Sequence, residues 1–328
     1  MASIMRIGIP KALMYQYYYP LWRSLFEHLG CEVVLSDHTA KGMVQKGISA
    51  SVPEICLPIK IYNAHIKNLM EKEVDYIFCP RFVHIEKGYW MCPKYIGLPE
   101  LVEASFPGVN LLTAEIDCRR EDTCDIKVFK PVYKKMGIGK GAMKKALSAA
   151  QKDWEQFRAY CHMGLTLDEA ATALFDKVPP EKFQQPKQDI TIGLLGYVYN
   201  VYDPFISMNV IQKLRDMGVN VITFDMLSEE DLKKHRPEKE RKIFWSFPDK
   251  LYQAARIMLE EKQVDGLIHI TAFGCGPDSI VGKEIEHDYS HYQKPFMTLR
   301  VDEHTGENHL QTRIEAFVDM MKRKKVAI

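Results

Sequence analysis

Short apolar runs alternate with amphipathic stretches along much of the chain. The first run, residues 5–9, precedes a helical pattern at 15–29 with aromatic and apolar residues on one side, and a second run follows at 32–35. Runs of this length are typical of buried parallel strands, whereas a helix that covers a sheet needs only one apolar face. The alternation therefore predicts an α/β fold with mostly parallel sheets.

The same signals place the remaining elements. Further strands are predicted at residues 74–79, 109–113, 190–195, within 217–225, at 266–270 and at 296–299. Helices are predicted at residues 41–48, 57–72 and 96–104, through most of 130–174, from Pro277 onward and up to Lys322. Within the long helical region, Trp154 and Phe157 are expected to face the core. The aromatic stretch 81–91 shows neither the hydrophobic period of a helix nor that of a strand, and it is expected to be irregular.

The opening of the chain recurs in its second half. After the Pro- and Gln-rich stretch 178–188, a strand, a helix that holds Pro204 and a strand beginning after Gly218 repeat the earlier order, with Pro20 and Gly30 at the matching places. Two strand–helix–strand domains of similar design, joined by a helical segment, account for this repetition. Two such domains leave a cleft between their strand ends.

The predicted boundaries follow from this reading. Residues 1–130 form the first α/β domain, residues 131–186 the helical segment and linker, and residues 187–328 the second α/β domain.

Composition and charge narrow the class of protein. The 328 residues are 46% hydrophobic and 27% charged, which is ordinary for a globular protein. A formal net charge of +1 provides no general attraction to nucleic acid or anionic membranes. No apolar run approaches the ~20 residues that a spanning helix needs, and the N-terminus lacks a signal-peptide core. We therefore expect a cytoplasmic protein without nucleic-acid or membrane partners.

Eight cysteines are many for a chain in a reducing compartment, where disulfides are rare. Three share one local design, in which the thiol stands just before a proline that can begin a helix: Cys56, Cys92 and Cys275. Two come from the first domain and one from the second. If they converge in the cleft, three thiolates and three helix N-termini surround one point, and helix dipoles favour an anionic group there.

Thiolates drawn from distant loops suit a [4Fe–4S] cluster better than zinc, because structural zinc sites often use C-x₂-C pairs and the chain has none. Three ligands leave one iron open. The alternative is three unrelated cysteines that happen to precede prolines. Cys79, which also precedes a proline, is the reserve ligand. Cys118 and Cys124 match no strong metal-binding spacing and are either loop cysteines or part of a second metal unit.

Other polar residues are candidates for lining the cleft or contacting a substrate: Lys60, His65, Arg81, His84 and Glu303. Lys60 and His65 follow Cys56 on the same helix, and either bind an anion and move protons or are a solvated lysine and a hydrogen-bonded core histidine. Glu303 follows the strand at 296–299, where it either does acid–base work or caps a helix.

Four motifs carry a resemblance to a known family: ICLPIK, MCPKYIGLPEL, FGCGPDS and TLRVDEHTGENHLQTRIEAF. With them the chain resembles the 2-hydroxyacyl-CoA dehydratase family, in the branch related to the acyl-CoA dehydratase activase. The resemblance implies two Rossmann- or flavodoxin-like domains and a [4Fe–4S] cluster, or a double-cubane [8Fe–9S] cluster, held by Cys56, Cys92 and Cys275. It also implies a homodimer.

The resemblance further implies low-potential electron transfer to a small substrate, such as an acyl-CoA, with an ATP-dependent activase of actin-like fold as the electron donor. The chain is shorter than the dehydratases proper, so its own catalysis stays open. It has no P-loop, because residues 137–141 lack the G-x-x-x-x-G-K-[ST] spacing. The alternative is a non-catalytic two-domain protein that carries a cluster or binds another metal.

Overall fold

The computed structural model describes residues 4–119, 125–235, 243–292 and 294–326. Two compact units are present. The first comprises Met1–Arg158 and Phe244–Ser246, and the second comprises Ala159–Ile243 and Phe247–Ile328. The predicted boundaries at residues 130 and 186 stay a prediction. No helix within the described ranges is long and apolar enough to cross a membrane.

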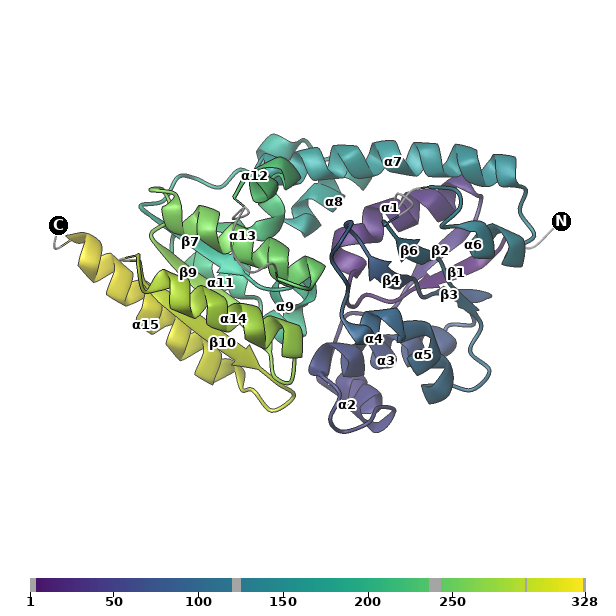
Figure 1. The fold of residues 1–328 in the computed structure, drawn as a ribbon, viewed down its shortest axis with the longest axis horizontal. Helices are drawn as coiled ribbons and strands as arrows, with labels where there is room; N and C mark the ends of the chain where they lie inside the picture. The colour runs from purple at the N-terminus through teal and green to yellow at the C-terminus, as the bar shows by residue number, and fades with distance from the viewer. Residues whose placement is uncertain (1–3, 120–124, 236–242, 293, 327–328) are drawn as a thin grey trace. The chain divides into compact units, whose positions relative to one another are not determined.

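The first unit is built on a four-stranded parallel sheet in the order β2-β1-β3-β5. Figure 1 labels strands β1, β2 and β3 of this sheet. Its strands are β1 (Arg6–Ile9), β2 (Glu32–Leu35), β3 (Tyr76–Phe78) and β5 (Leu111–Leu112). In the register, Ile7 of β1 pairs with Val33 of β2 and Tyr76 of β3. A second, two-stranded parallel sheet joins β4 (Arg81–His84) to β6 (Glu115–Asp117).

The helices of the first unit begin and end as local sequence signals indicate. They are α1 (Tyr15–His28), α2 (Lys41–Ser49), α3 (Leu57–Met70), α4 (Pro93–Ile96), α5 (Leu98–Ser105), α6 (Lys130–Lys135) and most of α7 (Lys140–His162). After α1, Gly30 adopts the left-handed conformation (φ 77°), and the Cys31 N–H donates to the Phe26 carbonyl at 3.0 Å. Glycine takes this conformation without strain, so the chain turns there into β2.

The second unit repeats this plan. Its four parallel strands have the order β10-β9-β7-β8, and they are β7 (Ile190–Leu195), β8 (Val219–Thr223), β9 (Gly266–Ala272) and β10 (Phe296–Val301). Read from the far edge, the order β8-β7-β9-β10 is the order β2-β1-β3-β5 of the first unit. The repetition in the sequence is therefore a repetition of sheet topology, and the predicted α/β class with mostly parallel sheets is confirmed.

The second unit has the more interrupted helices. They are α8 (Leu167–Phe175), α9 (Val198–Tyr202), α10 (Pro204–Ser207), α11 (Val210–Asp216), α12 (Glu229–Lys234), α13 (Ser246–Glu260), α14 (Gly276–Tyr289) and α15 (Glu307–Val326). The 3₁₀ turns Pro180–Phe183 and Phe224–Met226 complete the regular structure. Fully buried Ile192, Leu194, Ile268 and Ile270 line the centre of the sheet.

Two local expectations were wrong or incomplete, and two helices were not predicted. The single helix expected around Pro204 is three short helices, because Asp203 caps a new start at Pro204 and Met208 and Asn209 take left-handed conformations (φ 50° and 57°). The stretch 81–91 is not wholly irregular, since β4 lies within it. Helices α12 and α13 were not predicted from the sequence. As expected, Phe157 is fully buried.

Candidate cysteine site

Each of the three cysteines directly precedes a helix, as the proline that follows it predicted. Cys56 precedes α3, Cys92 precedes α4 and Cys275 precedes α14, and each helix has a proline in its first two positions. Helix α4 is only one turn long and ends at Ile96, and α5 begins at Leu98 after Gly97, so the helix expected after Cys92 is in two parts. The shared local design is thus present at all three positions.

Cys56 and Cys92 lie within electrostatic range of each other in the first unit. Burial raises the pKa of the Cys56 thiol, and the nearby Cys92 raises it further. Lys94 and the backbone N–H of Ile59 act in the opposite direction and favour the Cys56 thiolate. Cys56 is only 9% exposed, while Cys92 is half-buried. Lys94 therefore supplies positive charge beside this thiol pair, a role that the sequence analysis did not assign to it.

Cys275 belongs to the second unit and follows β9. Gly274 takes a left-handed conformation (φ 76°), and the Cys275 N–H donates to the Ala272 carbonyl at 3.1 Å. The Ser279 hydroxyl donates to the Cys275 carbonyl at 2.7 Å, which fixes the first turn of α14. In an open parallel sheet, ligands bind beyond the carboxyl ends of the strands, where the strand order reverses. Cys275 lies at that edge, next to the β7–β9 reversal.

The two units each contribute part of the cysteine set. Within the described residues, no group of three or more His, Cys, Asp or Glu side chains is placed to hold a metal ion. The convergence of the three thiols stays a prediction. None of the described cysteines forms a disulfide.

The reserve ligand, Cys79, directly follows β3 and is completely buried. Burial raises the pKa of its thiol to about 12, although the Tyr62 hydroxyl and the Arg81 guanidinium oppose that shift. A thiol held this firmly in the protonated form is a poor metal ligand, because the thiolate is the ligating species.

His65 and Lys60 are buried on α3. The His65 ring links two hydroxyls of the segment after β2, with Nδ1 2.8 Å from Ser36 Oγ and Nε2 3.0 Å from Thr39 Oγ1. Burial lowers the pKa of His65 to about 3, so the ring is neutral. The arrangement is that of a hydrogen-bonded core histidine. Lys60 is 5% exposed.

Arg81 and His84 lie on β4 and are both engaged. Arg81 donates to the Glu100 carboxylate and to the Ile96 carbonyl. The His84 Nδ1 lies 2.9 Å from Asp117 Oδ1 on the neighbouring strand, and burial lowers the pKa of this histidine. Arg81 thereby ties β4 to the end of α4.

The remaining candidates lie in turns or in the core. Glu303 follows β10 in a turn where Asp302, its neighbour, accepts hydrogen bonds from the His304 N–H and the Thr305 hydroxyl. Substrate roles for Glu303, Lys60, His65, Arg81 and His84 stay predictions. Cys31 and Cys161 are buried. Cys118 is half-buried, and Cys124 lies outside the described residues.

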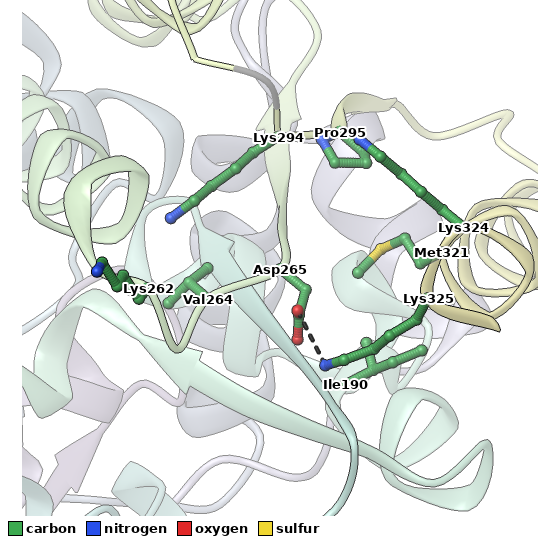
Figure 2. A pocket seen from close by; sticks show the side chains of 9 residues that line it. All are labelled: Ile190, Lys262, Val264, Asp265, Lys294, Pro295, Met321, Lys324 and Lys325. Carbon is green, nitrogen blue, oxygen red and sulfur yellow. Dashed lines mark hydrogen bonds and ion pairs between the residues drawn. The ribbon is translucent and has the colours of Figure 1, made fainter. Parts of the chain in front are cut away.

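A hollow of about 220 Å³ in the second unit does not involve the cysteines (Figure 2). It lies at the amino ends of β7, β9 and β10, opposite the edge that carries Cys275. Its lining combines apolar side chains with lysines, and one of these, Lys325, pairs with Asp265 at 3.0 Å. The hollow is therefore separate from the part of the unit that carries Cys275.

A polar pair that the sequence did not indicate spans the Cys275 turn. His269 on β9 and Asp278 in the first turn of α14 are both completely buried, with Nε2 and Oδ1 3.1 Å apart. The sequence does show a histidine within the apolar run of β9 and an aspartate in the FGCGPDS motif. Neither pattern shows that the two side chains meet.

Comparison with known proteins identifies the family. Residues 6–227 match the model of the CoA enzyme activase uncharacterised domain (DUF2229), and residues 210–321 match that of the 2-hydroxyglutaryl-CoA dehydratase D-component. No curated protein sequence matches the chain.

Among solved structures, the Lac repressor dimer bound to operator and the anti-inducer ONPF aligns with 98% of this chain and 88% of its own at 11% identity. The TM-score of that alignment is 0.23, so it carries no argument about fold or function. The first family model covers more than half of the chain and the second most of its last third. The chain therefore belongs to the CoA enzyme activase uncharacterised domain family, and is a member of the 2-hydroxyacyl-CoA dehydratase family related to the activase.

Proposed function

We propose that this protein holds an iron–sulfur cluster through Cys56, Cys92 and Cys275 and uses it in low-potential electron transfer to a small substrate. The observation that carries the proposal is the shared design of the three cysteines, each of which directly precedes a helix that has a proline in its first two positions. Family membership supports it, because the family of the dehydratase D-component is known to carry iron–sulfur clusters.

The residues present fit such a group. Cys92 is close enough to raise the pKa of the Cys56 thiol, and Lys94 favours the thiolate at Cys56. Burial of Cys56 and Cys275 excludes most water from the sulfurs. Cys56 and Cys275 stand at the N-termini of the long helices α3 and α14, where the unpaired N–H groups of the first turn favour negative charge. A donor set of thiolates beside N–H groups is the environment that an anionic cluster requires.

When bound, a [4Fe–4S] cluster supplies one-electron transfer at low potential, and a double-cubane [8Fe–9S] cluster is the alternative form. The chain's own residues bind the cluster, hold the thiolates and limit solvent access. With three cysteine ligands, one iron of a single cubane is left for a substrate, water or a bridging sulfide. A small molecule that is difficult to reduce, such as an acyl-CoA, is the proposed substrate class, which makes the protein a reductase or a dehydratase-type lyase component.

A separate ATP-dependent activase is the proposed electron donor. Residues 6–227 match a domain associated with CoA enzyme activases, and the sequence has no P-loop with which to bind ATP itself. We further propose that the protein acts as a homodimer in the cytoplasm.

Metal analysis after strictly anaerobic purification tests the cluster. We expect about four iron and four acid-labile sulfide per chain for a single cubane, or about eight iron for a double cubane. Serine substitution of any one of Cys56, Cys92 and Cys275 should lose or degrade the cluster. Cys31→Ser and Cys161→Ser are the matched controls and should keep the visible absorbance unchanged. Zinc without sulfide, or full iron in Cys275→Ser, would contradict the proposal.

Electron transfer is tested with a purified activase. The cluster absorbance should bleach only when activase, ATP and a low-potential reductant are all present. ATP hydrolysis by the purified chain alone would argue against a separate activase. Bleaching without any activase, at the same rate, would show that the partner is not needed.

A further inference from the structure

A buried polar pair spans the turn that carries Cys275. His269 precedes the turn on β9, and Asp278 follows it in the first turn of α14. The His269 Nε2 and Asp278 Oδ1 atoms are 3.1 Å apart, and both side chains are completely buried. The bond therefore closes a short loop, with Cys275 inside it.

Stability does not explain why such a pair is present. Buried ionisable pairs are often no more stabilising than apolar residues of the same size, because both groups lose their hydration. The pair here is also incompletely satisfied: among the described residues, His269 Nδ1, Asp278 Oδ2 and the nearby Thr271 Oγ1 have no hydrogen-bond partner. A polar arrangement that leaves buried atoms unsatisfied calls for a reason other than folding.

A glycine of α14 provides the space that the His269 imidazole occupies. A Cβ atom on Gly282 would lie 3.1 Å from His269 Cε1 and 3.3 Å from His269 Nδ1, so this glycine leaves room for the imidazole against α14. Gly282 is one turn after Asp278, and it therefore lies above the same side of the strand. One residue of β9 and two of α14 thus form a single buried unit.

We propose that His269 and Asp278 are positioning residues for Cys275, and that their pair fixes the turn in which this thiol is presented as a cluster ligand. The role as ligand rests on the proposed function. Other bonds constrain the backbone of the turn, including Phe273 N–H to the Val301 carbonyl at 2.8 Å and Cys275 N–H to the Ala272 carbonyl. The His269–Asp278 pair adds the side-chain link between strand and helix, without which α14 can shift along β9.

Alkylation of the metal-free protein tests the positioning without any cluster. Iodoacetamide labelling of the native chain, followed at the Cys275 peptide by mass spectrometry, measures how often the turn opens. His269→Leu and Asp278→Leu should raise the Cys275 rate about tenfold, the effect on an opening equilibrium of losing one buried hydrogen bond. Asp278→Asn, which can still bond to the ring, should restore most of the wild-type rate.

Two controls separate positioning from general loosening. Cys161 is completely buried in the same unit, and its labelling rate should not change in the variants. Tyr202→Phe removes another buried bond of this unit, the 2.8 Å bond to Asp225, and should lower the unfolding midpoint without raising the Cys275 rate. Equal rises at Cys161 and Cys275, or an unchanged Cys275 rate in folded His269→Leu, would overturn the proposal.

The loaded protein provides a second readout. In His269→Leu, the midpoint potential and the EPR signal of the reduced cluster should shift, whereas in Tyr202→Phe both should match the wild type. Wild-type protein that binds no iron would contradict the proposed function, and the labelling rates would still decide whether the pair fixes the turn. Identical potentials and EPR signals in wild type and His269→Leu would show that the pair does not position a ligand.

Discussion

Cys79 and Cys275 occupy corresponding places in the two units. Each follows the third strand of a four-stranded parallel sheet, Cys79 after β3 and Cys275 after β9. Only Cys275 goes on to begin a long helix, whereas Cys79 is followed by Pro80 and a further strand. The repeated topology thus places a cysteine at both strand ends, but the two thiols have different surroundings.

This difference predicts different effects of substitution. Cys79→Ser should leave the iron and sulfide content of the anaerobic protein unchanged, because burial keeps its thiol protonated with a pKa of about 12. Cys275→Ser should lose or degrade the cluster. Iron analysis of the two variants side by side provides the measurement, and loss of iron in Cys79→Ser would instead make Cys79 a ligand.

Lys94 should control the reactivity of Cys56 in the metal-free protein. Because Lys94 lowers the pKa of this thiol, Lys94→Gln should raise that pKa and slow iodoacetamide labelling of Cys56 at about pH 8 by about twofold to threefold. Lys87→Gln, which removes an exposed lysine, is the matched control and should label at the wild-type rate. A faster reaction in Lys94→Gln would show that this lysine does not act by charge.

His65 should make the protein less stable in acid. Its pKa is about 3 in the folded state and about 6.5 when unfolded, so between these values the unfolded chain binds more protons. The stabilisation of the fold that depends on a neutral His65 ring is therefore fully present above about pH 6.5. Below that pH the free energy of unfolding decreases by up to about 1.4 kcal/mol per pH unit. Urea unfolding at about pH 7 and pH 5.5 measures this loss.

Two variants assign the loss to His65. In His65→Gln the decrease in unfolding free energy between these pH values should be smaller than in the wild type. His309→Gln, whose side chain is exposed, should keep the full decrease. An equal pH dependence in His65→Gln and wild type would exclude His65 as its source.

The close approach of α2 and α3 should make Gly47 intolerant of a side chain. A Cβ at Gly47 would lie 2.1 Å from the Lys60 carbonyl oxygen and 2.8 Å from Ala64 Cβ, so α2 would have to move away from the helix that follows Cys56. Gly47→Ala should lower the unfolding free energy by about 1–3 kcal/mol. Gly42→Ala, on the same helix with open space around it, should be neutral or slightly stabilising, as denaturant titration can show.

Local sequence determined the elements and the cysteine design. The strand at Glu32–Leu35 was predicted with its observed ends, because a short apolar run after a helix-ending glycine has few other conformations. The prolines after Cys56, Cys92 and Cys275 marked helix starts for the same local reason. The repeated order of elements also predicted two sheets of like topology, because short right-handed crossovers allow few arrangements.

Tertiary structure decided the burial, the hydrogen-bond partners and the pKa of the polar side chains. On sequence alone the surroundings of His65 were open, and only the fold shows that its ring is buried between Ser36 and Thr39, with its pKa lowered to about 3. Likewise, His269 and Asp278 are nine residues apart, and nothing in a strand or helix period shows that their side chains meet. The pKa and partner of a side chain depend on burial and on neighbours from other elements, which the local pattern does not contain.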